Sequence, residues 1–316
     1  MKTILIGSPI RQKPNILSKF LQGLEEADRT DLEISYFFVD DNTEEKSSEL
    51  LRSFTERNRA VLVKGEELVS KETDSDYICD RSSHYWKTEN IDRITRFKDS
   101  IIEYCIEKKF DYLFLVDSDI VLAKKTLVHL VSREVEIVSN VFWTQWQVNG
   151  PLSPQCFWIP DLYQQNVSIN EKLSVEKANE VRKAMNSQLK VPGIYPVDGL
   201  GACTMIARSA LEKGVRFKAI PNLSVPGEDR HFCIRAGALG IALYMDTVFP
   251  VYHIFREEYL SRVDEFREKG FSFDMCQTFD ERAENAKNGE KAPSGKGGRL
   301  IRKIRRCASN IKKRFF

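Results

Sequence analysis

Apolar residues follow two alternating patterns along the first 122 positions of the chain. Short apolar runs, typical of strands buried on both faces, occur at 2–6, 34–39, 60–64 and 113–116. Between these runs, apolar residues recur at helical spacing, first from Ile16 to Leu24, then around 47–54 and again from Ile94 to Ile106. Alternation of strands and helices predicts an α/β fold, with a Rossmann-like, mostly parallel sheet flanked by helices.

The second half of the chain is less regular. Its patterns predict strands at 135–141, 202–207, 242–245 and 251–255, helices at 175–186 and 228–238, and a mobile loop at 192–201. We expect one domain over 1–265, a helical extension over 266–290 and a basic amphipathic tail over 291–316.

Polar residues stand where several of the predicted strands end. Gly7-Ser8-Pro9 follows the first strand, Asp40-Asp41 the second, and Asp117-Ser118-Asp119 interrupts the apolar run from Leu113 to Leu122. The carboxyl ends of parallel strands lie at one edge of a sheet, which is where ligands bind in such folds. Oxygen ligands of this kind suit Mg²⁺ or Mn²⁺. The alternative is that Asp-Ser-Asp is a turn that caps the following helix.

Two further sites carry candidate chemistry. Glu228 and Asp229 occupy the first turn of a predicted helix, where acids also complement the helix dipole. The functional interpretation is that Asp229 accepts a proton from an incoming hydroxyl as a general base, while Glu228 positions the acceptor. His253 is polar within an apolar strand, and is either a core residue or a neutral metal ligand beside Asp117 and Asp119.

In this order the motifs resemble GT-A fold nucleotide-sugar glycosyltransferases, most nearly the inverting family 2 type. The matching features extend from about Ile4 to Ile254: the first strand opening into Ser8-Pro9-Ile10-Arg11, then Asp40-Asp41, Asp117-Ser118-Asp119, Glu228-Asp229 and His253.

This resemblance implies a role for each matching residue. Asp40 or Asp41 is expected at the base or ribose, Asp117 at the ribose or metal, and Asp119 and His253 on the metal that holds the diphosphate. Asp229 is expected to deprotonate the acceptor. Two departures concern the acceptor: the Glu-Asp pair is followed by Arg-His-Phe-Cys, and the stretch from Glu66 to Asn90 matches no motif.

Basic and aromatic side chains complete the predicted site. Arg11, Arg93 and Lys98 are candidates to neutralise phosphate or ribose oxygens, although surface basic residues are commonly only solvated. Aromatic rings stack on sugars and also fill cores, so an acceptor or donor-sugar platform is one interpretation of the aromatic cluster after the metal motif. The candidate acceptor-binding residues are Trp143, Trp146, Trp158 and, in the glycine-rich loop, Asp198.

The charge of the chain is unevenly distributed. The net charge of +2 includes ten Lys or Arg and no acid within 291–316, and removing those ten from 48 basic residues leaves 38 against 46 acidic ones, about −8 for the body. Residues 299–316 place apolar side chains at near-helical spacing among the basic ones, which favours a helix on an anionic membrane surface. Nucleic acid is a competing polyanion that we do not expect as a partner, and a disordered tail is the further alternative.

Other features bear on location. No run approaches the roughly 18 apolar residues of a membrane span, and the N-terminus turns polar too soon for a signal peptide. The seven cysteines are odd in number and lack paired spacing, which favours reduced thiols. We therefore expect a cytoplasmic protein, with the inner membrane face as a possible site of attachment.

These patterns, together with the resemblance to GT-A fold glycosyltransferases, predict a metal-dependent, inverting glycosyltransferase that uses a nucleoside-diphosphate sugar and a glycan or lipid-linked acceptor. A nucleotidyltransferase acting on sugar phosphates would share the sheet and metal, but Gly7-Ser8-Pro9-Ile10-Arg11 is poor in the glycine of a phosphate loop. A non-catalytic nucleotide-sugar-binding scaffold would not need Asp229.

Overall fold

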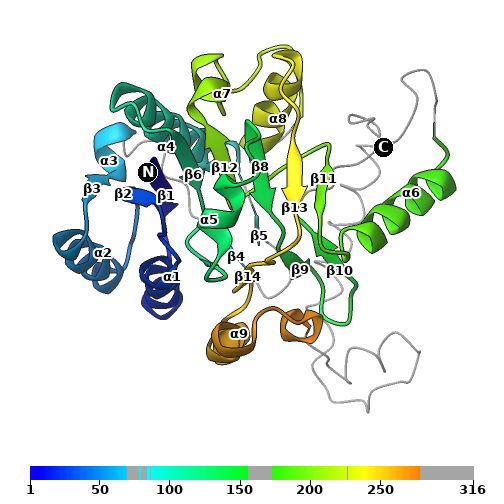
Figure 1. Ribbon diagram of the computed structural model, residues 1–316, viewed down its shortest axis with the longest axis horizontal. Helices are drawn as coiled ribbons and strands as arrows, with labels where there is room; N and C mark the ends of the chain where they lie inside the picture. Colours follow the sequence, from blue (N-terminus) through cyan, green and yellow to red (C-terminus); the bar gives the residue numbers. More distant parts are fainter. Residues whose placement is uncertain (70–77, 80–83, 86, 156–172, 226, 278–316) are drawn as a thin grey trace, which may run out of the picture. The chain divides into compact units, whose positions relative to one another are not determined.

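An eight-stranded sheet forms the centre of the structure, which is a computed structural model (Figure 1). The structure describes residues 1–69, 78–79, 84–85, 87–155, 173–225 and 227–277. Across the sheet, the strand order is β11 (Ile194–Pro196), β13 (Tyr244–Asp246), β8 (Ile137–Asn140), β12 (Thr204–Ala207), β6 (Tyr112–Leu115), β1 (Lys2–Ile10), β2 (Leu32–Asp40) and β3 (Ala60–Lys64).

Most strands of this sheet run in the same direction. β1 pairs in parallel with β2 and β6, β2 with β3, and β13 with β8. β12 pairs antiparallel with both β6 and β8, and β11 antiparallel with β13. The predicted α/β fold with a mostly parallel sheet is confirmed.

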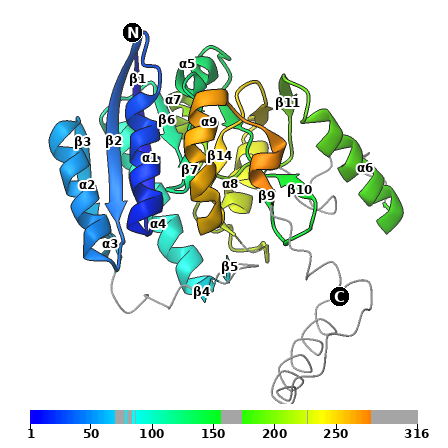
Figure 2. The same ribbon diagram turned by 90° about the horizontal axis from the view of Figure 1, so that it is seen from below.

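Helices cover both faces of the sheet because the strands are apolar on both sides. In β1, Leu5 contacts one core together with α4 (Thr88–Glu107), α7 (Arg208–Glu212) and α8 (Glu228–Ala238). Ile4 and Ile6, which point the other way, contact a second core with α1 (Pro14–Glu26), α2 (Glu45–Arg57) and α5 (Thr126–Val131). In Figure 2, α1 and α2 lie side by side along one side of the sheet.

Shorter elements complete the described chain. Three two-stranded ladders pair β7 (Ile120–Val121) with β14 (Tyr252–His253), β9 (Trp143–Gln145) with β10 (Leu152–Pro154), and β4 (Ile78–Cys79) with β5 (His84–Tyr85). The remaining helices are α3 (Gly65–Leu68), α6 (Val175–Gln188), η2 (Glu257–Arg262), α9 (Val263–Lys269) and η3 (Phe273–Cys276). Among the helices described, none is long and apolar enough to cross a membrane.

The first strand is longer than its sequence predicts. Gly7-Ser8-Pro9 was expected to follow it, but β1 continues to Ile10, paired with β2 throughout. The pairing of β1 with β6 ends at Gly7. Pro9, which has no N–H to donate, therefore lies beyond the last residue of β1 that pairs with β6. Ser8 and Pro9 therefore reach the carboxyl edge of the sheet as part of the strand.

The prediction of a mobile loop over 192–201 is wrong for its central residues. Ile194–Pro196 form strand β11, which pairs with β13 at the edge of the sheet. Thr247 fixes the start of this segment, since its Oγ1 accepts a hydrogen bond from Gly193 N at 2.9 Å. An edge strand held in this way is not free to act as a lid over its whole length.

The predicted domain boundary after residue 265 can be compared with α9 and with the extent of the compact unit. α9 spans Val263–Lys269, so the predicted boundary after residue 265 falls inside a helix. Met1–Gln277 form one compact unit. Most of the predicted helical extension, the whole basic tail and Trp158 lie outside the described residues.

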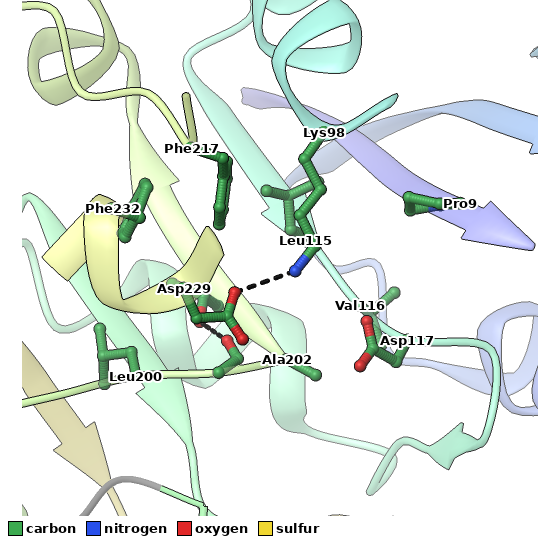
Figure 3. A pocket seen from close by; sticks show the side chains of 12 residues that line it. Pro9, Lys98, Leu115, Val116, Asp117, Leu200, Ala202, Phe217, Asp229 and Phe232 are labelled. Atoms are coloured by element: carbon green, nitrogen blue, oxygen red, sulfur yellow. Dashed lines mark hydrogen bonds and ion pairs between the residues drawn. The ribbon is translucent and has the colours of Figure 1, made fainter. Parts of the chain in front are cut away.

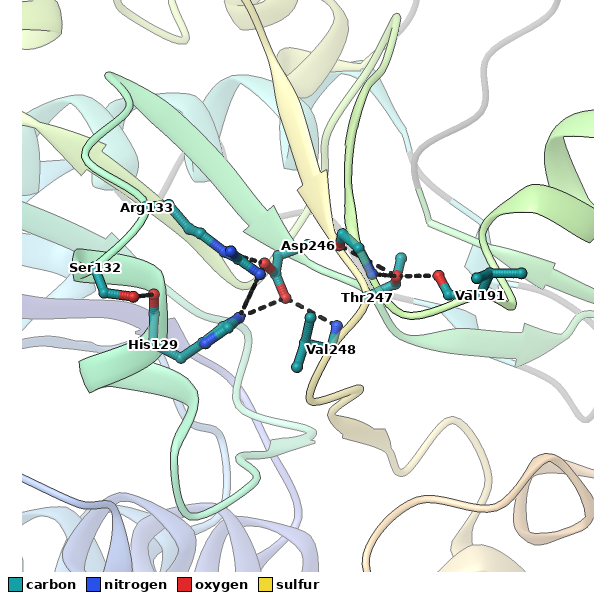
Figure 4. Close-up of polar contacts among 8 residues, drawn as sticks. His129, Ser132, Arg133, Val191, Asp246, Thr247 and Val248 are labelled. Carbon is teal, nitrogen blue, oxygen red and sulfur yellow. Dashed lines mark hydrogen bonds and ion pairs between the residues drawn. The ribbon is translucent and has the colours of Figure 1, made fainter.

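A buried carboxylate joins β13 to α5 and the turn after it (Figure 4). The Asp246 side chain is fully buried and accepts a hydrogen bond from Arg133 Nε at 2.6 Å and from Val248 N at 2.9 Å. His129 Nε2 lies 3.0 Å from the same carboxylate. Because a buried charge is costly without partners, these contacts fix the end of β13.

We expect Asp246→Asn to lower the free energy of unfolding by about 2–3 kcal/mol, because it removes the charge that Arg133 and His129 face. Urea unfolding measures this. Asp264→Asn is the matched control, since Asp264 is 68% exposed beside Lys19, and its cost should stay below about 1 kcal/mol. Equal costs for the two variants would contradict the structural role of Asp246.

Candidate active site

A pocket lies at the carboxyl end of β6, between β1 and β12 (Figure 3). Its walls are mainly apolar, but three charged side chains line it: Lys98 from α4, Asp117 from the segment after β6, and Asp229 from α8. Pro9, at the end of β1, lines the same pocket. A mainly apolar pocket with a few converging polar groups is typical of a binding or active site.

Lys98 makes ion pairs with both acids of α8. Its Nζ lies 2.8 Å from Glu228 Oε1 and 2.9 Å from Asp229 Oδ1. The two acids are adjacent because they occupy the first turn of α8, which begins after Gly227 in a left-handed conformation with φ of 94°. The structure thus brings together Lys98 and the predicted catalytic pair.

Burial perturbs both pocket carboxyl groups. It raises the pKa of Asp229 to about 7, and the neighbouring Glu228 adds to the rise while Lys98 opposes it. Burial likewise raises the pKa of Asp117 to about 6, against the opposing charge of Lys98 and with Asp119 adding to the rise. Perturbed acids gathered in one pocket are typical of functional sites.

Asp119 and His253 lie next to each other, as expected. The β7–β14 ladder pairs His253 with Ile120, and Ile254 N donates to Asp119 O at 2.8 Å. His253 Nε2 lies 3.5 Å from Asp119 Oδ2. On the other side of the ring, Nδ1 shares a 2.8 Å hydrogen bond with Thr144 Oγ1, which orients the imidazole.

The pair fits a divalent ion only with help from a substrate. Within the part of the chain that the structure describes, no three His, Cys, Asp or Glu side chains are grouped to hold a metal ion. Asp119 and His253 supply one carboxylate and one imidazole. Mg²⁺ and Mn²⁺ are commonly bound by one or two protein groups, with water and substrate phosphates as the other ligands. The donor set therefore suits a metal diphosphate, whereas a three-ligand set that includes Asp117 is not assembled.

The acids after β2 have different partners. Asp40 is buried and accepts hydrogen bonds from Lys64, Asn42 and Ser48; although burial raises its pKa, these bonds hold the pKa below its ordinary value. Asp41 pairs with Arg93, whose Nε lies 3.1 Å from Oδ1.

Arg11 is the second basic partner of Asp41, with Nη1 3.7 Å from Oδ2. Arg11, Asp41 and Arg93 thus form a second polar group. Of the other predicted donor-binding residues, Pro9, Lys98 and Asp117 line the pocket, whereas Ser8, Asp40 and Ser118 belong to neither group. Ser8 and Ser118 are both buried.

The predicted acceptor residues differ in exposure. Trp146 is 43% exposed and contacts Phe255 edge-on, with ring centroids 5.2 Å apart. Trp143 is buried against Phe273, so its ring has no open face for a sugar. Asp198 is buried as well.

Sequence analysis missed several residues that shape these sites. Thr144 orients His253 only because β9 and β14 lie close together, and neither strand signals this in the sequence. Gly65 leaves room for the Asp41–Arg93 pair: a Cβ there would lie 2.6 Å from Asp41 Oδ1 and 3.2 Å from Arg93 Nη2, so one of these side chains would have to shift. Phe217 lines the pocket from a segment with no recognisable motif.

Residues 1–148 match the family model described as Glycosyltransferase family 25, N-terminal domain. The predicted resemblance to GT-A fold glycosyltransferases is confirmed. The matching model is that of family 25, and it covers β1 to β9, including Asp117 and Asp119 but neither Asp229 nor His253.

Curated relatives are similar over the same part of the chain. A Glycosyltransferase 25 family member of Drosophila melanogaster is 26% identical over 131 residues, which is 42% of this chain and 21% of the relative. One of Anopheles gambiae is 23% identical over 140 residues, 44% of this chain and 24% of the relative. The matched segments thus span less than a quarter of these relatives' length.

Solved structures show a weaker similarity. TarS residues 1–349 of S. aureus has a TM-score of 0.46 at 12% identity, covering 80% of this chain and 60% of that one. The mannosyltransferase PcManGT of Pyrobaculum calidifontis, solved with GDP-Man and Mn²⁺, has a TM-score of 0.46 at 13% identity, covering 92% and 65%.

We expect Asp117 and Asp229 to titrate with apparent pKa values of about 6 and about 7, because both are buried. Carboxyl-carbon NMR of aspartate-labelled protein measures this, and Asp229→Asn should remove the upper transition. Asp264→Asn, at an exposed position, should leave both transitions in place. Ordinary titration of both acids near pH 4 would contradict the effect of burial.

Proposed function

We propose that this chain is a metal-dependent glycosyltransferase. It would transfer a sugar from a nucleoside-diphosphate sugar to a hydroxyl acceptor with inversion, and Asp229 would be the general base. The observation that carries the proposal is the pocket that Asp117 and Asp229 line from different elements, next to the Asp119–His253 pair. The family 25 model over residues 1–148 supports sugar transfer as the reaction class.

The environment of Asp229 suits a general base. Its pKa of about 7 lies near neutral pH, where a base combines a substantial deprotonated fraction with good proton affinity. An acceptor hydroxyl that binds in the pocket gives its proton to this carboxylate while its oxygen attacks the anomeric carbon. A single displacement from the face opposite the leaving diphosphate inverts that carbon.

The donor would lie along the carboxyl edge of the sheet. Asp119 and His253 are the residues that would hold a divalent ion, and such an ion neutralises negative charge on the leaving diphosphate. Asp41, with Arg11 and Arg93, is suited to the nucleoside end, since its group combines acceptors and donors beside the end of β1. Asp40 supports this region from beneath through Lys64 and Ser48.

Among the predicted acceptor-binding residues that the structure describes, Trp146 is the one whose exposed ring is suited to contact the acceptor. Its exposed ring contacts Phe255, whose ring centroid is 5.5 Å from that of His253, so an aromatic surface leads outward from the metal pair. Aromatic faces of this kind stack on sugar rings. A glycan or lipid-linked acceptor remains our proposal. A membrane role for residues 299–316 and a cytoplasmic location remain predictions from the sequence.

A thermal-shift screen of nucleoside diphosphates with and without Mn²⁺ tests donor binding. We expect one base to raise the melting temperature, and to do so more strongly with Mn²⁺, because the diphosphate completes the ligand set of Asp119 and His253. Asp119→Asn should remove the Mn²⁺-dependent part of the shift. If no nucleotide stabilises the protein under either condition, the proposal fails.

Asp229→Asn tests the chemical step. We expect it to lower turnover of the donor by about 10²–10⁴-fold while nucleotide binding persists, because the amide cannot take the proton. Release of nucleoside diphosphate from the donor identified by the screen measures turnover, and Asp264→Asn is the matched control at an exposed site. Unchanged turnover in the variant would exclude Asp229 as the base. If the wild type binds the nucleotide but shows no turnover, a non-catalytic binding scaffold is favoured.

A further inference from the structure

Lys98 is a buried cation held among acids (Figure 3). Its side chain is 8% exposed, and its Nζ donates to Glu228 Oε1 at 2.8 Å and to Asp229 Oδ1 at 2.9 Å. The Asp117 carboxylate acts on the same ammonium group through its charge. Without these acids, the charged form of a lysine buried to this extent would be disfavoured, because burial removes its hydration.

An aromatic wall fixes the position of this cation. The Lys98 Nζ lies 4.8 Å from the centroid of the Phe217 ring, and that ring stacks on Phe232 of α8 with centroids 4.5 Å apart. A cation over an aromatic face gains further stabilisation. Lys98 therefore connects α4 to the first turn of α8 through both charge and packing.

We propose that Lys98 is a positioning residue that holds Asp229 as an oriented carboxylate, and that it is not a ligand of the donor phosphates. The proposal rests on the proposed function, in which Asp229 is the base. Lys98 occupies Oδ1 of Asp229, so Oδ2 is the oxygen that takes the proton. In the transfer, the acceptor O–H bond breaks and its proton goes to Oδ2, the new bond forms from the acceptor oxygen to the anomeric carbon, and the electron pair of the broken sugar–phosphate bond leaves on the diphosphate. Lys98 keeps its protons throughout.

Local charge argues against a phosphate-binding role. One ammonium group faces Glu228, Asp229 and Asp117, so the surroundings of Lys98 carry a net negative charge. A phosphate would be repelled by these acids and would have to displace two short ion pairs to reach Nζ. The positive charge of Lys98 is instead needed to offset the burial and like-charge repulsion that disfavour ionised Asp229.

The test is the pH dependence of donor turnover in Lys98→Met, which keeps the buried stem and removes the charge. We expect the low-pH side of the kcat/KM profile to move upward by at least about one pH unit, kcat at pH 7 to fall by at least about fivefold, and donor KM to stay within about twofold. Lys98→Arg retains the charge and should keep the profile near its wild-type position. Lys108→Gln, at the exposed end of α4, is the control and should match the wild type.

Two results for Lys98→Met would overturn the proposal. An unmoved pH profile with a large rise in donor KM would make Lys98 a phosphate ligand. An equal loss of kcat/KM at every pH would make the role of Lys98 purely structural. If Lys98→Met does not fold, Glu228→Gln provides the measurement, because loss of that neighbouring charge should move the low-pH side of the profile downward, and an unmoved profile counts against the proposal. Asp229→Asn distinguishes failure of the proposed function from failure of the role given to Lys98. If Asp229→Asn stays active, the proposed function fails. If Asp229→Asn is inactive but the pH profile of Lys98→Met is unmoved, only the role of Lys98 is excluded.

Discussion

The structure depends on how it compensates negative charge that is buried at the carboxyl edge of its sheet. Asp117 and Asp229 face one mainly apolar pocket, and Lys98 is the cation that the fold supplies to them. Burial alone would favour protonation of both acids, and the positive charge of Lys98 opposes it. The raised pKa values of Asp117 and Asp229 result from this balance between burial and the charge of Lys98.

The reversed strand β12 has a direct consequence for the site. Because β12 runs antiparallel between β6 and β8, the segment that enters it, including Gly201 and Ala202, reaches the pocket beside Asp117. A sheet that was parallel throughout would have placed the carboxyl end of a strand there. The site is thus formed where an N-terminal parallel unit meets a segment of opposite direction.

The second half of the site depends on very short ladders. β7 and β14 pair over only two residues each, yet this pairing sets His253 beside Asp119, and β9 brings Thr144 to the far side of the imidazole. The third core cluster, with Tyr252 and Val263 among its members, packs beneath β14 and holds it in place. The position of the Asp119–His253 pair is therefore a result of packing, with little contribution from strand propensity.

The sequence by itself determined the elements and the chemical types at the strand ends. Apolar runs and helical spacing predicted β2 and α4 closely, because burial on both faces of a sheet and one face of a helix leaves a local periodic record. Only the tertiary structure decided which charges meet. Lys98 is 131 positions from Asp229, and Thr144 is 109 from His253, so no local pattern records these contacts. Likewise the exposure of Trp146 and the burial of Trp143 follow from neighbours distant in the chain, which periodicity in so short a segment cannot encode.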